Sequence, residues 1–179
     1  MIKKVLFFLL LAVPAQGIAQ VELTAEGFYG IGHGKDKADC YGGLLLVGKR
    51  FDDISVSVGT GYEVLHKDSN YDFIPILASV RYYPFESRIA PFVSMTGGGC
   101  IGITTKNEDT GEKYRPDVLF APGIGLDIPV FGRHCVTLQV RYNVQHFKYD
   151  ATVGSGNYSQ HVSDAHSFKQ VAFSVGFTF

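Results

Sequence analysis

The segment QVAFSVGFTF, residues 170–179, alternates between two kinds of side chain up to the last residue of the sequence. Its apolar positions are Val171, Phe173, Val175, Phe177 and Phe179, and small or polar residues stand between them. A period of two residues predicts a β-strand with one apolar face. Chain ends fray unless something holds them, so a phenylalanine in the last position predicts an apolar environment that receives the strand. That environment is either a protein core or the interior of a lipid bilayer.

The first 19 residues have the features of a secretory signal peptide. Lys3 and Lys4 precede an apolar run over residues 5–13, and small residues stand before an expected cleavage ahead of Gln20. The run is shorter than the roughly 18 apolar residues of a membrane-spanning helix, and no later stretch reaches that length. We therefore expect an exported chain without a helical anchor, whose residues 20–179 form one domain. No cysteine follows the expected cleavage site, which argues against a lipoprotein.

Charge and composition narrow the class of protein further. Without Lys3 and Lys4, the 16 basic residues become 14 against 17 acidic ones, a net charge of −3 that offers no basic field to a nucleic acid. The 21 glycines, 14 phenylalanines and 10 tyrosines suit a single all-β domain. Cys40, Cys100 and Cys135 are too few and too scattered for a disulfide framework, and the sequence leaves open one bridge or three free thiols.

Eight segments are expected as strands. They are residues 21–32, 40–51, 55–66, 71–85, 90–103, 119–130, 135–148 and 167–179. At about 3.3 Å per residue and a tilt near 40°, twelve residues rise about 30 Å, which is enough to cross the apolar band of a membrane. The short connections DDI, ESRI and FGRH alternate with longer polar ones. An even number of long strands with alternating short and long connections predicts an all-β, eight-stranded antiparallel up-and-down transmembrane β-barrel.

The polar face of these strands contains charges in mid-strand. They are Glu26, Glu63, Arg81, Asp127 and Arg141. Side chains fill the lumen of an eight-stranded barrel, and isolated buried ions are costly, so we expect these lumen charges to pair with one another. A lumen filled in this way predicts a barrel without an open pore.

A soluble lipocalin-like carrier, with its apolar face turned inward, shares the strand count and the export signal. The connections, the strand lengths and the glycines of the presumed polar face favour the membrane instead; these glycines are Gly59, Gly61, Gly97, Gly99, Gly123 and Gly125. In a membrane, Phe173, Val175 and Phe177 would face lipid and Phe179 would lie at the inner interface. Aromatic girdles near the two rims would then include Tyr29, Tyr62, Tyr82 and Tyr142.

The alternating strands, the leader ending GIAQ and the closing VAFSVGFTF resemble the eight-stranded outer-membrane barrels represented by the OmpA membrane domain, OmpX and the opacity-type proteins. The chain is most similar in style to the small outer membrane protein β-barrel domains of Bacteroidetes. This resemblance is architectural and covers the whole mature chain. It implies a location in the outer membrane of a Gram-negative bacterium and insertion by the barrel-assembly machinery. In such families that machinery reads an assembly signal in the last strand, matched here by Val171, Phe173, Val175, Phe177 and Phe179.

Three prolines depart from the pattern of a fully paired barrel, because proline lacks the N–H group that a strand ladder uses. Pro75 and Pro122 fall within expected strands, and we expect a bulge or a late strand start near the outer rim at each. Pro129 is expected to end the sixth strand.

The last long loop contains residue types that occur in metal and hydrolytic sites. They are His146, Asp150, Ser155, Ser159, His161, Ser163, Asp164 and His166. One class of barrels that modify lipid A places a histidine and a serine together near the outer rim, but RYNVQHFKYD has no serine two residues after His146. A solvated loop is the simpler interpretation, and MTGGGCIG lacks the ending of a phosphate-binding loop. We therefore expect no catalytic residue, no metal and no cofactor.

Together these features predict a monomeric integral outer-membrane protein that contacts membrane lipid and has no enzymatic activity. Its structural or surface-interaction role would lie in the loops 106–117 and 149–166, through an extracellular partner. Two alternatives stay open at this point: an outer-membrane enzyme that modifies lipid A, and a soluble lipocalin-like carrier.

Overall fold

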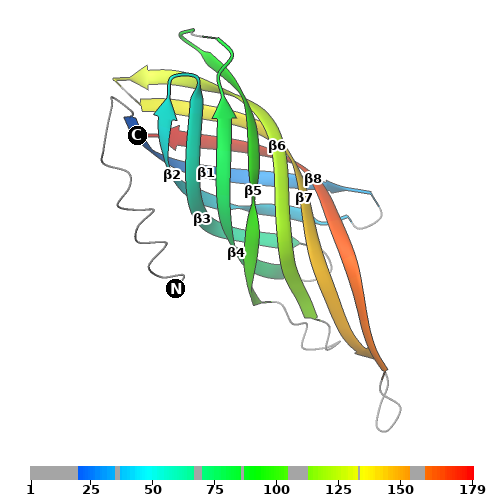
Figure 1. Ribbon diagram of the computed structural model, residues 1–179. Coiled ribbons are helices and arrows are strands. Elements are labelled where there is room, and N and C mark those ends of the chain that lie inside the picture. Colours follow the sequence, from blue (N-terminus) through cyan, green and yellow to red (C-terminus); the bar gives the residue numbers. More distant parts are fainter. Residues whose placement is uncertain are drawn as a thin grey trace, which may run out of the picture.

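The computed structural model is a closed barrel of eight antiparallel strands, which confirms the expected fold (Figure 1). The strands are β1 (Gln20–His33), β2 (Asp39–Phe51), β3 (Ile54–His66), β4 (Asn70–Tyr82), β5 (Ala90–Thr104), β6 (Lys113–Phe131), β7 (His134–Val153) and β8 (Gln160–Thr178). Each strand pairs with the next along the chain, and β8 pairs with β1 to close the barrel. The structure describes residues 20–34, 37–66, 70–85, 87–104, 113–132, 134–153 and 160–179. The expected signal peptide lies outside these ranges, within which no helix is long and apolar enough to cross a bilayer.

Three strands are longer at their outer ends than the sequence predicts. β6 begins at Lys113 rather than at residue 119, β7 continues to Val153 rather than to 148, and β8 begins at Gln160 rather than at 167. Residues 113–117, 149–153 and 160–166 were therefore wrongly expected as loop, while 105–112 and 154–159 lie outside the described residues. Their polar sequence suggested loop, but pairing with neighbouring strands, as between Val153 and Gln160, extends the ladder. Figure 1 shows β7 and β8 projecting beyond the other strands at the lower right.

The contrast between short and long connections is weaker than expected. At the inner end, β2 and β3 are joined by Asp52 and Asp53, with Asp52 at a positive φ of 45°. The inner connection 83–89 is longer than the expected ESRI because β4 ends at Tyr82 and not at residue 85. It is also longer than the outer connection 67–69. The alternation of short and long connections is therefore a weaker indicator of this fold than the pairing of its strands.

The two mid-strand prolines lie inside β4 and β6, and neither marks a strand start. Pro75 pairs with Cys100 of β5. The pairing of β4 with β3 is interrupted at Pro75, between the pair Thr60–Ile76 and the pair Glu63–Phe73. Pro75 has no N–H to offer β3, and the Thr60 hydroxyl instead donates to the Pro75 carbonyl at 2.8 Å.

Pro122 pairs with Met95 of β5, and Pro129 does not end β6, which continues to Phe131. The register shifts lie elsewhere than expected, at Asp72/Phe73, Pro116/Leu119 and Pro129/Phe131. The prolines are tolerated because a strand can lose a ladder bond to one neighbour and keep its pairing with the other.

The outer wall of the barrel is an apolar belt between two rows of aromatic residues. Tyr29, Tyr41, Tyr62 and Tyr142 form the outer row, and Phe51, Tyr82, Phe131, Phe177 and Phe179 the inner one. From Tyr62 to Ile54 on β3, or from Tyr41 to Phe51 on β2, the strand rises about 20–26 Å, close to the ~25 Å apolar band of a membrane barrel. Exposed Val, Leu and Ile side chains fill the belt, while buried polar residues face inward. This inside-out pattern is that of a protein whose solvent is lipid.

The last residue is held in place at the inner rim. The Phe179 N–H donates to the Leu23 carbonyl at 2.8 Å, and its ring lies 4.8 Å from that of Phe177, centre to centre. His134 packs against both rings. The terminal aromatic therefore belongs to the inner girdle.

Two glycines on the lumen face make room for large side chains. A Cβ on Gly125 would lie 2.4 Å from the ring of Phe92, and one on Gly123 would lie 2.8 Å from Arg141 Cγ. Gly97 and Gly99 were expected on the polar face, but they lie on the lipid side. The inward residues of β5 are Phe92, Ser94 and Thr96, so the odd-numbered positions that alternate with them face outward.

Candidate functional site in the barrel lumen

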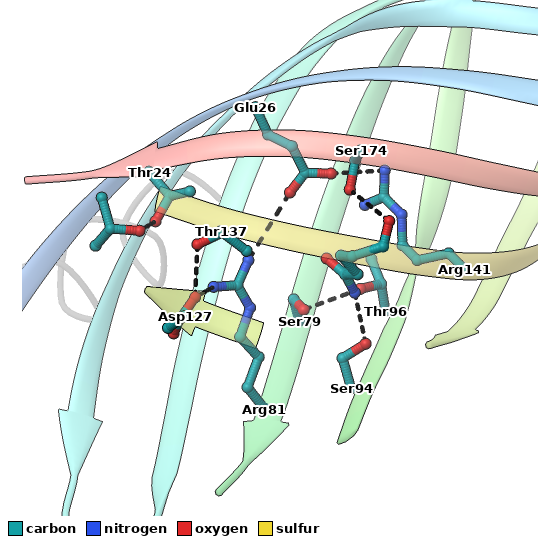
Figure 2. A network of polar contacts seen from close by, with 12 residues as sticks. Thr24, Glu26, Ser79, Arg81, Ser94, Thr96, Asp127, Thr137, Arg141 and Ser174 are labelled. Atoms are coloured by element: carbon teal, nitrogen blue, oxygen red, sulfur yellow. Dashed lines mark hydrogen bonds and ion pairs between the residues drawn. The ribbon is translucent and has the colours of Figure 1, made fainter. Parts of the chain in front are cut away.

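Four of the predicted lumen charges form one buried layer in the barrel (Figure 2). Arg141 of β7 lies 2.7 Å from Glu26 of β1, and Arg81 of β4 lies 3.8 Å from the same carboxylate. Arg81 also approaches Asp127 of β6 at 4.0 Å. The layer holds two cations and two anions, so its charges cancel within the barrel. It crosses the lumen from β1 to β4 and β6.

Hydrogen bonds and aromatic rings hold this charged layer in position. Asp127 accepts a hydrogen bond from Thr137 at 2.6 Å and one from the Tyr83 hydroxyl at 2.8 Å. Burial raises the pKa of the Tyr83 phenol, which follows the end of β4, so this group stays protonated and can donate. Arg81 stacks over the ring of Phe92 and Arg141 over that of Phe28, at 4.8 and 5.5 Å from their centroids.

Neutral polar pairs occupy the lumen around the charged layer. Gln139 donates to Ser94 at 2.6 Å, the Ser79 and Thr96 hydroxyls are 2.9 Å apart, and those of Thr24 and Thr178 are 2.8 Å apart. All six side chains are buried. These six side chains therefore bond to one another in pairs, whereas the Nε atoms of Arg81 and Arg141 have no hydrogen-bond partner among the described residues.

Glu63 is the fifth predicted lumen charge, and it lies apart from the layer, nearer the outer end. It is 2% exposed, and no ion pair between described residues includes it. Its polar neighbours are Cys40 and Gln145, and the Arg141 guanidinium also acts on its carboxyl group. Cys40 donates to Gln170 at 3.0 Å, and Gln145 donates to Cys100 at 3.4 Å. The three cysteines are free thiols. No group of three potential metal ligands occurs among the described residues.

An aromatic plug of Phe73, Phe147 and Phe168 lies in the outer part of the lumen. The ring centroids of Phe73 and Phe147 are 5.2 Å apart and those of Phe147 and Phe168 are 5.1 Å apart, and each side chain is at most 1% exposed. Outside the barrel at this height lie the exposed polar residues His146, Lys148 and Lys169. On β7 and β8 the polarity of the two faces thus inverts beyond the outer girdle, where polar residues face outward and Phe147 and Phe168 face inward.

The plug was not predicted, and neither were the contacts of Tyr83 and Thr137 with Asp127. One signal was present: the inward set of β7, Gln139, Arg141, Asn143 and Gln145, continues to Phe147. Phe147 is apolar at an inward position of a strand whose preceding inward residues are polar. Such a residue indicates the height at which the inward face of the strand changes from polar to apolar.

The sequence has no serine two residues after His146, but the structure places a serine beside this histidine on the neighbouring strand. Ser167 of β8 pairs with His146 of β7, and the Ser167 hydroxyl lies 2.8 Å from His146 Nδ1 on the exposed outer surface. No carboxylate contact to His146 occurs among the described residues. The side chains of Asp150, Ser155, Ser159, His161, Ser163, Asp164 and His166 lie outside what the structure describes.

The fold matches known outer-membrane barrels. Outer membrane protein AlkL, solved in DMPC bilayers, is similar at a TM-score of 0.61, with 16% identity and 93% of each chain covered. Neisserial surface protein A gives a TM-score of 0.65 at 14% identity, covering 90% of this chain and 98% of that one. OprG from Pseudomonas aeruginosa gives 0.58 at 12%, covering 89% and 95%. No family model and no curated protein matches the sequence.

The chain therefore has the fold of the bacterial outer-membrane barrels. The expected resemblance is confirmed at that level, and the Bacteroidetes-type subgroup stays a prediction. The expected location in the outer membrane agrees both with this fold and with the apolar belt on the outer wall. The outward apolar face is the opposite of what a lipocalin-like carrier requires.

Proposed function

We propose that the protein is a closed, non-enzymatic barrel of the outer membrane that acts at the cell surface through its outer strands and loops. The main support is that side chains occupy the lumen at two heights. The charged layer around Glu26 and Arg141 is one, and the plug around Phe147 is the other. An ion crossing the barrel would have to displace both. Reconstituted in planar bilayers, the protein is expected to give no stable conductance, and a steady open channel would contradict a closed barrel.

The surface role is supported by the length of the β7–β8 hairpin. Beyond Tyr142 of the outer girdle, β7 continues to Val153, a rise of about 25–30 Å, and β8 returns from Gln160. A paired hairpin of this length presents residues well above the lipid surface. Replacing 154–159 by a tight turn is expected to change cell-surface binding or envelope permeability while the barrel keeps its heat-modifiable gel mobility. Unchanged surface properties would count against the proposal.

The bond between Ser167 and His146 favours a second candidate, an enzyme that modifies lipid A. A serine nucleophile needs a base within hydrogen-bonding distance, which this pair offers, but also a group that orients the histidine and donors for the oxyanion. The described residues supply no carboxylate to His146, so we favour a structural bond. The lipid A profile of cells is expected to be the same with and without the protein; a change that disappears in His146→Ala would instead establish the enzyme.

The assembly signal is part of the same proposal. The lipid-facing position of Phe173 and Val175 and the anchored Phe179 support recognition of β8 by the barrel-assembly machinery. Phe179→Ser keeps the backbone bond to Leu23 and removes only the ring. In cells it is expected to lower the heat-modifiable fraction several-fold, while purified protein refolds in detergent as the parent does; equal insertion in cells would contradict the role of the ring.

A further inference from the structure

The exterior of β7, β8 and β1 has an outer basic patch just beyond the outer girdle. It consists of His33, His146, Lys148 and Lys169, all exposed. Lys169 and His33 are directly opposite in the β8–β1 ladder, and His146 and Lys148 follow each other on the same face of β7. The last two strands and the first strand of the barrel therefore bring these side chains to one surface.

The height of the patch is fixed by the girdle beneath it. His33 Nε2 lies 3.1 Å from the Tyr142 hydroxyl. Val171 of β8 pairs with Tyr142 on one side and Ile31 on the other, and Lys169 is the next outward residue of β8, about 7 Å further along the strand. Girdle tyrosines lie at the level of the lipid headgroups. The patch is therefore at headgroup level, directly above an apolar wall that contacts acyl chains.

Two carboxylates near the rim, among the side chains that the structure describes, already have neighbours of their own. Asp39 of β2 accepts the Gly32 N–H at 2.9 Å and the Tyr29 hydroxyl at 3.2 Å. The Asp72 carboxylate of β4 lies beside the Tyr62 hydroxyl. No ion pair between described residues includes Lys169. Among the described side chains, the rim thus has basic residues on β7, β8 and β1 and acidic ones on β2 and β4.

We propose that the outer basic patch binds the phosphate group of an outer-leaflet lipid whose acyl chains lie on the wall below. The Lys169 ammonium supplies the charge, and Lys148 and His33 flank it. A lipid is favoured over free phosphate because Val171, Val144 and Ile31 continue the site as an apolar surface. The inference goes beyond the proposed surface role, since it involves neither the lumen nor the connection 154–159.

The test compares two lipids with identical acyl chains, phosphatidic acid and diacylglycerol, bound to detergent-solubilised protein and counted by native mass spectrometry. The parent protein is expected to retain phosphatidic acid at least about tenfold more tightly than diacylglycerol. The double variant Lys148→Gln/Lys169→Gln is expected to lose about tenfold in affinity for phosphatidic acid. Gel mobility before and after boiling verifies that each variant is folded.

A matched control is Lys49→Gln, because Lys49 is an outward lysine at the inner rim, 5.1 Å from the ring centroid of Phe51. This control is expected to bind phosphatidic acid as the parent does. The proposal is overturned if the double variant binds like the parent, if Lys49→Gln abolishes binding, or if diacylglycerol binds equally well. Displacement of phosphatidic acid by an equal concentration of inorganic phosphate would also overturn it, since the patch would then recognise free phosphate.

Discussion

Glu26→Gln is expected to lower the free energy of unfolding by about 3–5 kcal/mol, because it leaves two buried guanidinium groups with one anion between them. Arg141 lies 2.7 Å from Glu26 and Arg81 lies 3.8 Å from it, and the Glu26 side chain is fully buried. Glutamine keeps the volume of the side chain and removes only the charge. Urea unfolding in lipid vesicles, followed by the heat-modifiable gel shift, measures the loss.

Glu22→Gln is the matched control for this prediction, since Glu22 lies on the same face of β1, is partly exposed and accepts one bond from Ser55 at 3.0 Å. It is expected to cost under about 1 kcal/mol. The double variant Glu26→Gln/Arg141→Gln restores the balance of charge and is expected to recover part of the loss. If Glu26→Gln unfolds at the same urea concentration as Glu22→Gln, the charged layer does not stabilise the barrel.

Phe147→Ala is expected to cost about 3–5 kcal/mol, because it removes the ring that joins Phe73 to Phe168 and leaves a cavity in the plug. The Phe147 side chain is 1% exposed, and its neighbours are held on other strands, so they cannot easily close the gap. The same unfolding measurement applies. Phe147→Leu keeps most of the volume and is expected to cost roughly 1 kcal/mol.

Phe85→Ala serves as the control for the aromatic plug, since Phe85 is 66% exposed in the inner connection. Its removal is expected to change stability by no more than about 0.5 kcal/mol. Equal losses in Phe85→Ala and Phe147→Ala would show that the outer end of the lumen is not a packed core.

The barrel could be predicted from the sequence because apolar and polar residues alternate with a period of two in nearly every strand. The alternation around Arg141 and around Phe173 assigns the faces of β7 and β8 without any knowledge of their neighbours. The inward position of the five predicted charges follows from the same period. The outer ends of β6, β7 and β8 could not be predicted in this way, because polar segments such as QHVSDAH form strands only when a partner strand completes their hydrogen bonds.

What the sequence by itself determined is the list of residues on each face, since the pleat of a strand is local. Which of these residues meet was decided only by the closed barrel, because the register of eight strands brings Glu26, Arg81, Asp127 and Arg141 to one height and Phe73, Phe147 and Phe168 to another. The same closure places Lys169 beside His33, which are distant along the chain, while the register of β7 with β8 places Ser167 beside His146. Contacts across a lumen depend on register and curvature, and these are properties of the whole sheet.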